Sequence, residues 1–299
     1  MTSLSSCRPG RGAHVPMDHL RIASVPFVNA QPLTWGFLSG PYRGIFEVSR
    51  VPPSRIPDLL RSNKVDVGLI PSIEYLRLPG VEFLPQMCIA SKRRVRSVIL
   101  VSRVPLAEIR SVALDTNSRT SAALLKILLR RRGLGDIRYA EQAPSLRDML
   151  LEHDAALLIG DAALTADVTG LHVLDLAAEW FAQTRLPFVF ALWAARPGVV
   201  VPDGVRPFIE SRRLGVANIP SIAVLEGQRL KLAPESIESY LRTNIHYYLG
   251  SEERRGLDLF FRLAQQLGVA PGRRAIRYRD PFEWERVPST PAPARRTLE

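Results

Sequence analysis

The sequence predicts an α/β fold with two lobes, between which the chain crosses twice. Strand-like apolar runs alternate with helical segments over most of the 299 residues, a pattern typical of α/β layers with mostly parallel strands. From residue 203 onward the pattern is almost entirely helical, and these helices need an existing sheet to cover. We therefore expect residues 19–104 and 195–280 to form the first lobe and residues 105–194 the second, with crossings near Arg103 and Arg196.

The first lobe is expected to begin with a strand over 21–29, after which Pro32 suits the first turn of a helix. Residues 65–70 are a continuous apolar run, which is typical of a strand buried on both faces. The other elements expected in this lobe are helices over 31–38 and 54–62 and strands over 46–51, 83–90 and 97–102.

In the second lobe, a buried strand over 111–114 leads through a hydroxyl-rich loop into a helix over 120–132. Three arginines and Gly133 end this helix, because cations suit its carbonyl end and glycine adopts the left-handed conformation that stops it. The sequence further predicts a helix over 145–152, strands over 155–159, 173–176 and 188–194, and C-terminal helices over 205–214, 236–249 and 251–267.

The composition is that of an ordinary globular protein, with 46% hydrophobic and 23% charged residues. The net charge of +11 comes almost entirely from arginine, which fits either guanidinium recognition of carboxylates or the codon usage of a GC-rich genome. Nucleic-acid binding is disfavoured because the arginines are scattered and carry no recognisable motif. Residues 1–18 and 281–299 are expected to be disordered, and translation could start at Met17 instead of Met1.

No metal and no cofactor are expected. The five histidines lie far apart in the sequence, and neither a Walker loop nor a G-x-G-x-x-G motif is present. Cys7 and Cys88 lie in an expected tail and an expected buried strand, so a disulfide is not expected and the cytosol is the default compartment. No apolar run reaches the roughly 20 residues of a membrane span, so no membrane association is expected either.

Small polar residues follow the ends of several predicted strands, and the loop 115–121 is the most informative of these places. Strand-to-helix turns also occur at 67–72 and 156–161, and together the three turns predict a cleft at strand ends and helix starts, which favours anions. Capping of helices would explain Ser118, Thr120 and Asp161 equally well. The candidate ligand-binding residues are Asn29, Ser72, Ser97, Ser118, Thr120, Ser121 and Asp161.

Six segments, in order, resemble the pattern of the chorismate dehydratases of the futalosine route to menaquinone, the MqnA family. The resemblance covers about residues 19 to 268 and is carried by segments 24–33, 66–75, 95–98, 115–121, 158–164 and 186–193. It implies the two-domain fold of type II periplasmic binding proteins, in agreement with the double crossing. It also implies loss of water from chorismate to give 3-[(1-carboxyvinyl)oxy]benzoate, catalysed by a carbon–oxygen lyase of the hydro-lyase class.

The resemblance also implies roles for individual residues. Asn29 and Ser97 would be catalytic, orienting the enolpyruvyl carboxylate of the substrate and assisting the leaving hydroxyl, and that carboxylate itself could take the ring proton. Thr120, Ser121 and the helix start would hold the ring carboxylate. The full set of substrate-binding candidates is Ser72, Arg96, Ser118, Thr120, Ser121, Gly160 and Asp161.

Two other functions stay open at this point. A sister enzyme of the same pathway, 1,4-dihydroxy-6-naphthoate synthase, relies on a histidine in an Ile-His-Glu turn, whereas this chain has Ile159-Gly160-Asp161. A non-catalytic protein that binds small anions would share the same fold. The sequence leaves open the oligomeric state, the identity of the catalytic base and which arginine, if any, binds the second carboxylate; Arg96 is one candidate.

Overall fold

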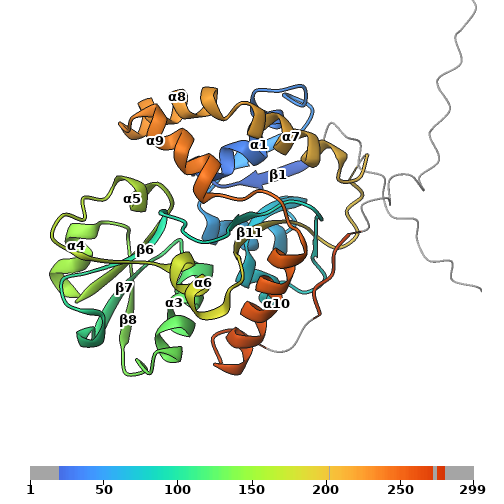
Figure 1. The fold of residues 1–299 in the computed structure, drawn as a ribbon. Helices are drawn as coiled ribbons and strands as arrows, with labels where there is room; N and C mark the ends of the chain where they lie inside the picture. The colour runs from blue at the N-terminus through green and yellow to red at the C-terminus, as the bar shows by residue number, and fades with distance from the viewer. Residues whose placement is uncertain (1–19, 202, 272–274, 280–299) are drawn as a thin grey trace, which may run out of the picture.

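The computed structural model describes residues 20–201, 203–271 and 275–279, so the two segments expected to be disordered, 1–18 and 281–299, lie outside the described residues. Two sheets with helices packed around them form the molecule, and the chain passes from the first sheet to the second and back (Figure 1). The predicted α/β fold with two lobes and a double crossing is confirmed.

The first sheet forms the core of the first lobe. Its strands follow the order β2-β1-β3-β11-β4, and β5 pairs with β11 beyond this path. Strand β1 runs parallel to β2 and β3, whereas β11 is antiparallel to β3. The strands are β1 (Arg21–Ser24), β2 (Glu47–Arg50), β3 (Val67–Pro71), β4 (Glu82–Phe83), β5 (Ile89–Ser91) and β11 (Phe188–Ala195).

The second sheet has the order β10-β6-β9-β7-β8. Strand β7 is parallel to β8 and β9, whereas β6 is antiparallel to β9 and β10. Its strands are β6 (Val98–Ser102), β7 (Ser111–Asp115), β8 (Arg138–Gln142), β9 (Ala155–Ile159) and β10 (His172–Asp175).

Two predictions about the strands are wrong. The chain changes sheets between Ser91 and Val98 and again between Asp175 and Phe188, so the boundaries at 104 and 195 do not follow the sheets. The sheets are also mixed and not mostly parallel, because β6 and β11 run against their neighbours. Strands β6 and β11 begin at the junction of the lobes, whereas β1, β3, β7 and β9 end at that junction. The apolar runs of β6 and β11 would look the same in either sheet, so the sequence alone does not say which sheet each of them joins.

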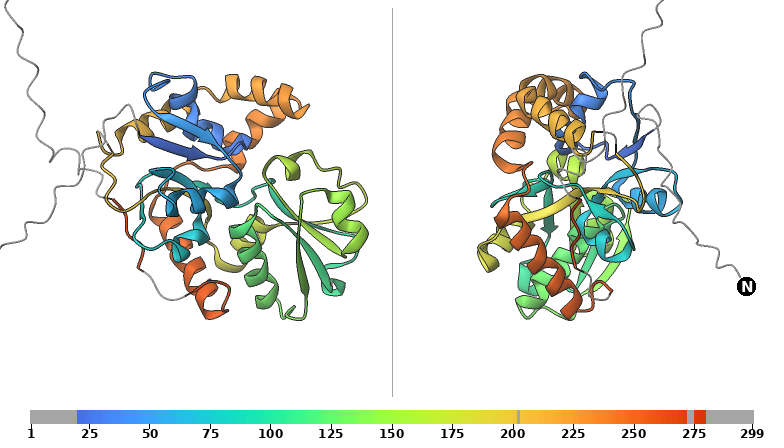
Figure 2. Two further views of the ribbon diagram at one scale, coloured as in Figure 1. Left: turned by 180° about the vertical axis from the view of Figure 1, so that it is seen from behind. Right: turned by 90° about the vertical axis from the view of Figure 1, so that its right-hand side faces the viewer.

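Helices cover both sheets. Around the first sheet lie α1 (Gln31–Leu38), α2 (Ile56–Arg61), α7 (Arg206–Ala217), α8 (Ile219–Leu230) and α9 (Pro234–Ser239). Around the second lie α3 (Arg119–Arg131), α4 (Leu146–Glu152), α5 (Gly160–Thr165) and α6 (Leu176–Thr184). Helix α10 (Ser251–Gln266) packs against β11 and also against α3, so it bridges the two lobes (Figure 2). Short 3-10 turns are η2 (Val28–Ala30), η3 (Pro53–Arg55), η4 (Ser72–Arg77) and η5 (Leu106–Glu108).

Helices α1 and α7 pack closely because small residues face each other. A Cβ atom on Gly215 would lie 2.0 Å from the carbonyl oxygen of Pro32, so only glycine fits there. The Ser211 hydroxyl donates to the Leu33 carbonyl at 2.8 Å and accepts from the Gly36 amide at 2.9 Å. This packing fixes α1, and with it the preceding turn η2 that carries Asn29.

The predicted helix over 236–249 is also wrong in part. Helix α9 ends at Ser239, a single π-helical turn, η6 (Tyr240–Asn244), follows, and the chain then becomes extended. His246 pairs with Ala90 in an antiparallel bridge beside β5, so backbone pairing with the crossing segment replaces the last helical turns. Strand β8 and helices α6 and α8 were not predicted, and the predicted strand over 83–90 is instead two short strands, β4 and β5.

Both crossings are held together by one buried carboxylate. Asp175 accepts from the backbone amides of Val95 and Arg96 at distances of 2.7 to 3.2 Å. The same side chain caps α6 by accepting from the amides of Ala177 and Ala178 at 3.1 and 3.0 Å. The outgoing segment 92–97 and the start of the returning segment are therefore fixed to each other at the junction of the lobes.

Candidate active site

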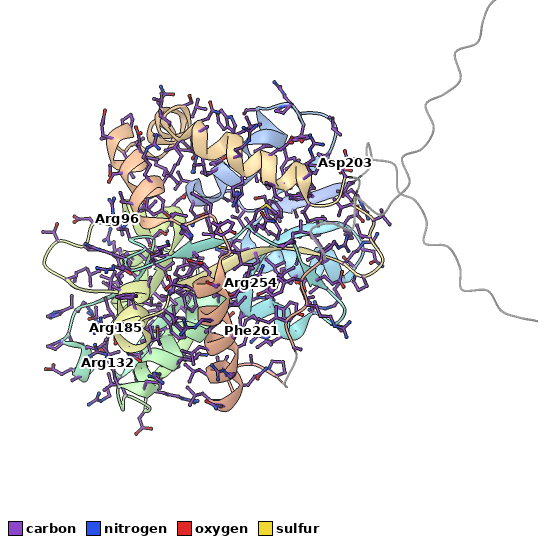
Figure 3. The ribbon with its side chains drawn as sticks, turned by 45° about the vertical axis from the view of Figure 1, so that its right-hand side comes forward. Arg96, Arg132, Arg185, Asp203, Arg254 and Phe261 are labelled. Atoms are coloured by element: carbon purple, nitrogen blue, oxygen red, sulfur yellow. The ribbon has the colours of Figure 1, made fainter. Side chains whose placement is uncertain are left out.

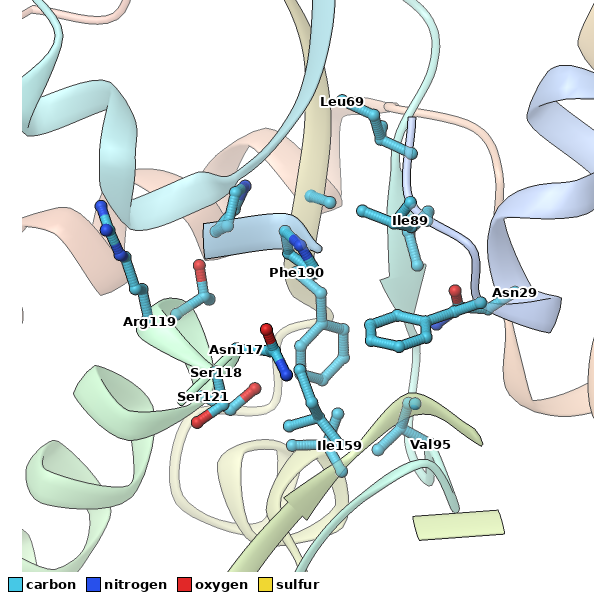
Figure 4. A pocket seen from close by; sticks show the side chains of 18 residues that line it. Asn29, Leu69, Ile89, Val95, Asn117, Ser118, Arg119, Ser121, Ile159 and Phe190 are labelled. Atoms are coloured by element: carbon cyan, nitrogen blue, oxygen red, sulfur yellow. The ribbon is translucent and has the colours of Figure 1, made fainter. Parts of the chain in front are cut away.

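A pocket lies between the lobes, where the strands of both sheets end or begin. Its empty space is about 550 Å³ when the open solvent at its mouth is included, and its wall is mostly apolar, as is usual for small-molecule sites. Figure 4 shows Asn29 on one side, Ser118 and Ser121 on the other, and Phe190 between them. The residues with polar side chains that line the pocket are Asn29, Asn117, Ser118, Arg119, Thr120 and Ser121.

The start of α3 forms one end of the pocket and leaves hydrogen-bond donors unused. Asp115 closes the preceding turn by accepting from the backbone amide and side chain of Asn117, at 2.8 and 3.2 Å. Ser118 occupies the N-cap position, but its side chain makes no capping hydrogen bond. The residue is only 3% exposed, and its hydroxyl has no partner within the described chain. The backbone amides of Arg119, Thr120 and Ser121 likewise have no acceptor among the described residues. Unused donors at the positive end of a helix dipole suit a carboxylate.

Asn29 forms the opposite end. It lies in the turn η2 directly after β1 and is one of the pocket-lining residues. Its side-chain oxygen Oδ1 is buried and finds no hydrogen-bond partner in the described part of the chain. Since buried polar atoms are nearly always hydrogen bonded, this oxygen is available to a ligand or a water molecule.

Ser97 lies behind this end of the pocket and does not line it. The residue is fully buried in the crossing segment, next to Val98, which does line the pocket. Its hydroxyl accepts from the Tyr240 hydroxyl at 2.7 Å, and its backbone carbonyl accepts from the Gly160 amide at 2.8 Å. Burial raises the pKa of Tyr240 far above its ordinary value, while hydrogen bonds with Ser97 and Asn29 act in the opposite direction.

Gly160 permits a close approach of the two lobes. Its φ angle of +58° is in the left-handed region, and a Cβ atom there would lie 2.9 Å from the ring of Phe27. Phe27 and Gly160 both line the pocket, so this contact shapes its wall. A side chain at position 160 would be strained and would collide with that ring.

Ser72 and Thr120 contact each other across the lobes. The Thr120 hydroxyl accepts from the Ile73 amide at 3.2 Å and lies 3.5 Å from the Ser72 hydroxyl, which donates to the Val189 carbonyl at 2.8 Å. Thr120 lines the pocket, whereas Ser72 is fully buried beside it. In this arrangement the two hydroxyls hold the lobes together.

Asp161 also joins the lobes. Its carboxylate accepts from the Val28 amide at 3.0 Å and pairs with Arg229 at 2.6 Å. A second interlobe pair links Arg119 to the buried Glu74 at 3.0 Å. These contacts lie around the pocket and connect the two lobes.

Arg96 lies apart from the pocket. Its backbone amide donates to Asp175, its φ angle is +63°, and its guanidinium reaches the Ser236 hydroxyl at 3.4 Å. Figure 3 marks the place of Arg96 in the molecule. The structure therefore brings together five of the nine candidates as lining residues, namely Asn29, Ser118, Thr120, Ser121 and Gly160. Sequence reasoning did not single out Asn117, Arg119 or Tyr240, although the first two lie within the loop that it favoured.

Within the described ranges, no group of three or more His, Cys, Asp or Glu side chains is placed to hold a metal ion. Over the same ranges, none of the helices combines the length and the apolar character that crossing a membrane requires.

The fold resembles several solved structures. A protein from Archaeoglobus fulgidus superposes with a TM-score of 0.70 and 18% identity, covering 84% of this chain and 98% of the other. The periplasmic aliphatic sulphonate binding protein of Escherichia coli gives a TM-score of 0.60 and 18% identity, covering 85% and 89%. At these identities the likeness establishes the fold alone, which is that of the periplasmic binding proteins.

Sequence comparison identifies the family. The chorismate dehydratase of Thermus thermophilus is 35% identical over 243 residues, covering 75% of this chain and 88% of the relative. The chorismate dehydratase of Campylobacter jejuni is 24% identical over 232 residues, covering 77% and 88%. A family model described as menaquinone biosynthesis matches residues 20–266. The chain belongs to this menaquinone biosynthesis family.

Proposed function

We propose that this protein is a chorismate dehydratase of menaquinone biosynthesis by the futalosine route. The observation that carries the proposal is the pocket between the lobes, where the unused donors of the α3 start face the unpartnered Asn29 oxygen across apolar walls. Two relatives named chorismate dehydratase and the family support the same assignment. The product is 3-[(1-carboxyvinyl)oxy]benzoate, and the reaction is that of a hydro-lyase.

The reaction needs little acid or base strength from the protein. Removal of the ring proton at the ether-bearing carbon leaves an electron pair conjugated through the ring alkene to the ring carboxylate. That pair forms the new ring double bond as the neighbouring carbon–oxygen bond breaks, and the departing hydroxide takes up a proton to become water. The ring becomes aromatic, which drives the step.

The α3 end of the pocket suits the ring carboxylate of the substrate. We assign the ring carboxylate to the amides of Thr120 and Ser121 and to the Ser118 hydroxyl, because negative charge is stabilised at a helix start. Asn29 and Ser97 then orient the two reacting groups of the substrate: the Ser97 hydroxyl donates to the enolpyruvyl carboxylate, and the Asn29 oxygen accepts from the ring hydroxyl that leaves. The described residues that line the pocket include no His or Lys, so we assign the proton transfer to that same carboxylate of the substrate.

The sister synthase is disfavoured by position 160. Its histidine would fall where this chain has a glycine with positive φ packed against Phe27, which leaves no room for an imidazole. The cytosol remains the proposed compartment, where the buried thiol of Cys88 would stay reduced.

The test is to incubate the purified protein with chorismate, without added metal or cofactor, and to follow the aromatic product by absorbance and mass. We expect one product, lighter than chorismate by one water molecule. Recovery of unchanged chorismate from a folded preparation that binds it would contradict the proposal and favour an anion-binding protein.

A further inference from the structure

Three polar side chains from distant parts of the sequence meet beside the pocket. Asn29 comes from the turn after β1, Ser97 from the crossing segment and Tyr240 from the π-helical turn η6. Tyr240 is 1% exposed, and its hydroxyl is 2.7 Å from the Ser97 hydroxyl. The Tyr240 hydroxyl also interacts with the Asn29 side chain, which contributes to its pKa. A buried tyrosine hydroxyl between two candidate catalytic side chains is not explained by packing alone.

The donor and the acceptor of the hydrogen bond between Tyr240 and Ser97 are fixed, with Tyr240 as the donor. The single hydroxyl proton of Tyr240 is donated to Ser97, so the Tyr240 oxygen can only accept from Asn29, whose side chain acts to lower the pKa of Tyr240. The Ser97 oxygen accepts the hydrogen bond from Tyr240, so the proton of the Ser97 hydroxyl is free to be donated to another group. Asn29 uses its nitrogen toward Tyr240, which leaves Oδ1 as the atom without a partner among the described residues.

The π-helical turn that carries Tyr240 is tied to the segment that carries Ser97. The Asn244 side chain donates to the Arg94 carbonyl at 3.0 Å, and Arg96 reaches the Ser236 hydroxyl at 3.4 Å. Isolated π-helical turns are rare and occur frequently at functional sites. The tyrosine and the serine are therefore held on one connected unit.

We propose that Tyr240 is a positioning residue that fixes the Ser97 hydroxyl as a donor and the Asn29 oxygen as an acceptor toward the substrate. This inference rests on the proposed function, since it assigns the two fixed groups to chorismate. Tyr240 acts through its neighbours and does not line the pocket.

The first measurement compares Tyr240→Phe with the parental enzyme. Loss of the hydroxyl frees the Ser97 rotamer, so kcat should fall about 10-fold to 100-fold while KM changes less than about threefold. Tyr42→Phe is the matched control, because it also removes a partly buried hydroxyl hydrogen bond, to Glu210, but away from the pocket. The control should keep the parental kcat. A Tyr240→Phe enzyme with parental kcat would overturn the inference.

The second measurement asks whether Tyr240 acts through Ser97. The double variant Tyr240→Phe/Ser97→Ala should be no slower than Ser97→Ala alone, within about twofold, because residues that act as a unit are not additive. A residue that only supported the fold would instead multiply the two losses. Multiplied losses would overturn the inference while leaving the proposed function intact.

A third measurement does not depend on turnover. Calorimetry with 3-[(1-carboxyvinyl)oxy]benzoate gives the affinities of the parent, the two single variants and the double variant. If the parent binds this compound but does not convert chorismate, the proposed function fails, and coupling between Tyr240 and Ser97 in affinity still supports the positioning role. Absence of that coupling would overturn it. A parent that neither binds the compound nor converts chorismate would overturn both proposals.

Discussion

The two ends of the pocket present polar groups in different ways. At the α3 start the donors are backbone amides and one serine hydroxyl, each without a partner in the described chain and each fixed by the helix itself. At the other end, the Tyr240 hydroxyl donates to Ser97 beside Asn29, and the Asn29 oxygen has no partner among the described residues. We therefore propose that the first end binds a charged group, while the second orients groups during the reaction.

The largest effect is expected at the second end. Asn29→Ala should lower kcat by about 10² to 10³, the usual cost of one preorganised group, while affinity for the product changes less than about threefold. Steady-state kinetics and calorimetry measure the two quantities separately. A variant that loses affinity but keeps kcat would show that this end serves binding instead.

Gly160→Ala tests the part of the pocket wall that Gly160 and Phe27 form. The new methyl group collides with Phe27, and kcat/KM should fall about 10-fold or more. Gly133→Ala is the matched control, because Gly133 has a φ of +77° and a Cβ atom added there would meet nothing within 4 Å. Both variants should lose about 1 to 2 kcal/mol of stability through the left-handed backbone, measured by denaturant unfolding. Equal activity in both would contradict the account of the wall.

Ser118→Ala tests the binding end. The Ser118 hydroxyl does not cap α3, so stability should stay within about 0.5 kcal/mol while affinity for the product falls about 10-fold. Asp175→Ala provides the contrast, since Asp175 caps α6 and holds the crossing segment. That variant should lose about 2 to 4 kcal/mol of stability. Denaturant unfolding measures the stability of the two variants, and calorimetry measures their affinity for the product. A destabilised Ser118→Ala variant would show that Ser118 has a structural role.

Arg229→Ala is expected to have the smallest effect. It breaks the interlobe pair with Asp161, but Arg229 is 43% exposed, so the affinity for the product should fall only about twofold to fivefold. Arg206→Ala, which breaks the exposed pair with Glu210 in α7, is the control and should not change affinity. The difference between the two variants should shrink at high salt. A difference that persists at high salt would show that the interlobe pair is not acting through its charge.

Local signals predicted one end of the pocket better than the other. The loop 115–121 contains its own strand end, turn and helix start, so its position and its free amides follow from neighbouring residues. Ser97 and Tyr240 are separated by 143 positions, and the helical pattern around Tyr240 gives no sign of a π-helical turn. Contacts between distant segments depend on tertiary packing, which periodicity does not report.

The same limit explains the errors in the fold. The buried strands β6 and β11 are apolar on both faces, so their sequences predict a strand without saying which sheet it joins. The roles of Ser72, Thr120 and Asp161 depend on how the lobes meet, because each contacts the opposite lobe. Their residue types fit substrate binding and interlobe contact equally well.

The most direct test of the central claim is a crystal structure of the Ser97→Ala variant with chorismate, in which slow turnover would preserve the substrate. We predict the ring carboxylate within about 3 Å of the amides of Thr120 and Ser121, and the enolpyruvyl carboxylate beside Asn29. Chorismate bound outside the pocket between the lobes, or bound with its two carboxylates exchanged, would contradict the account.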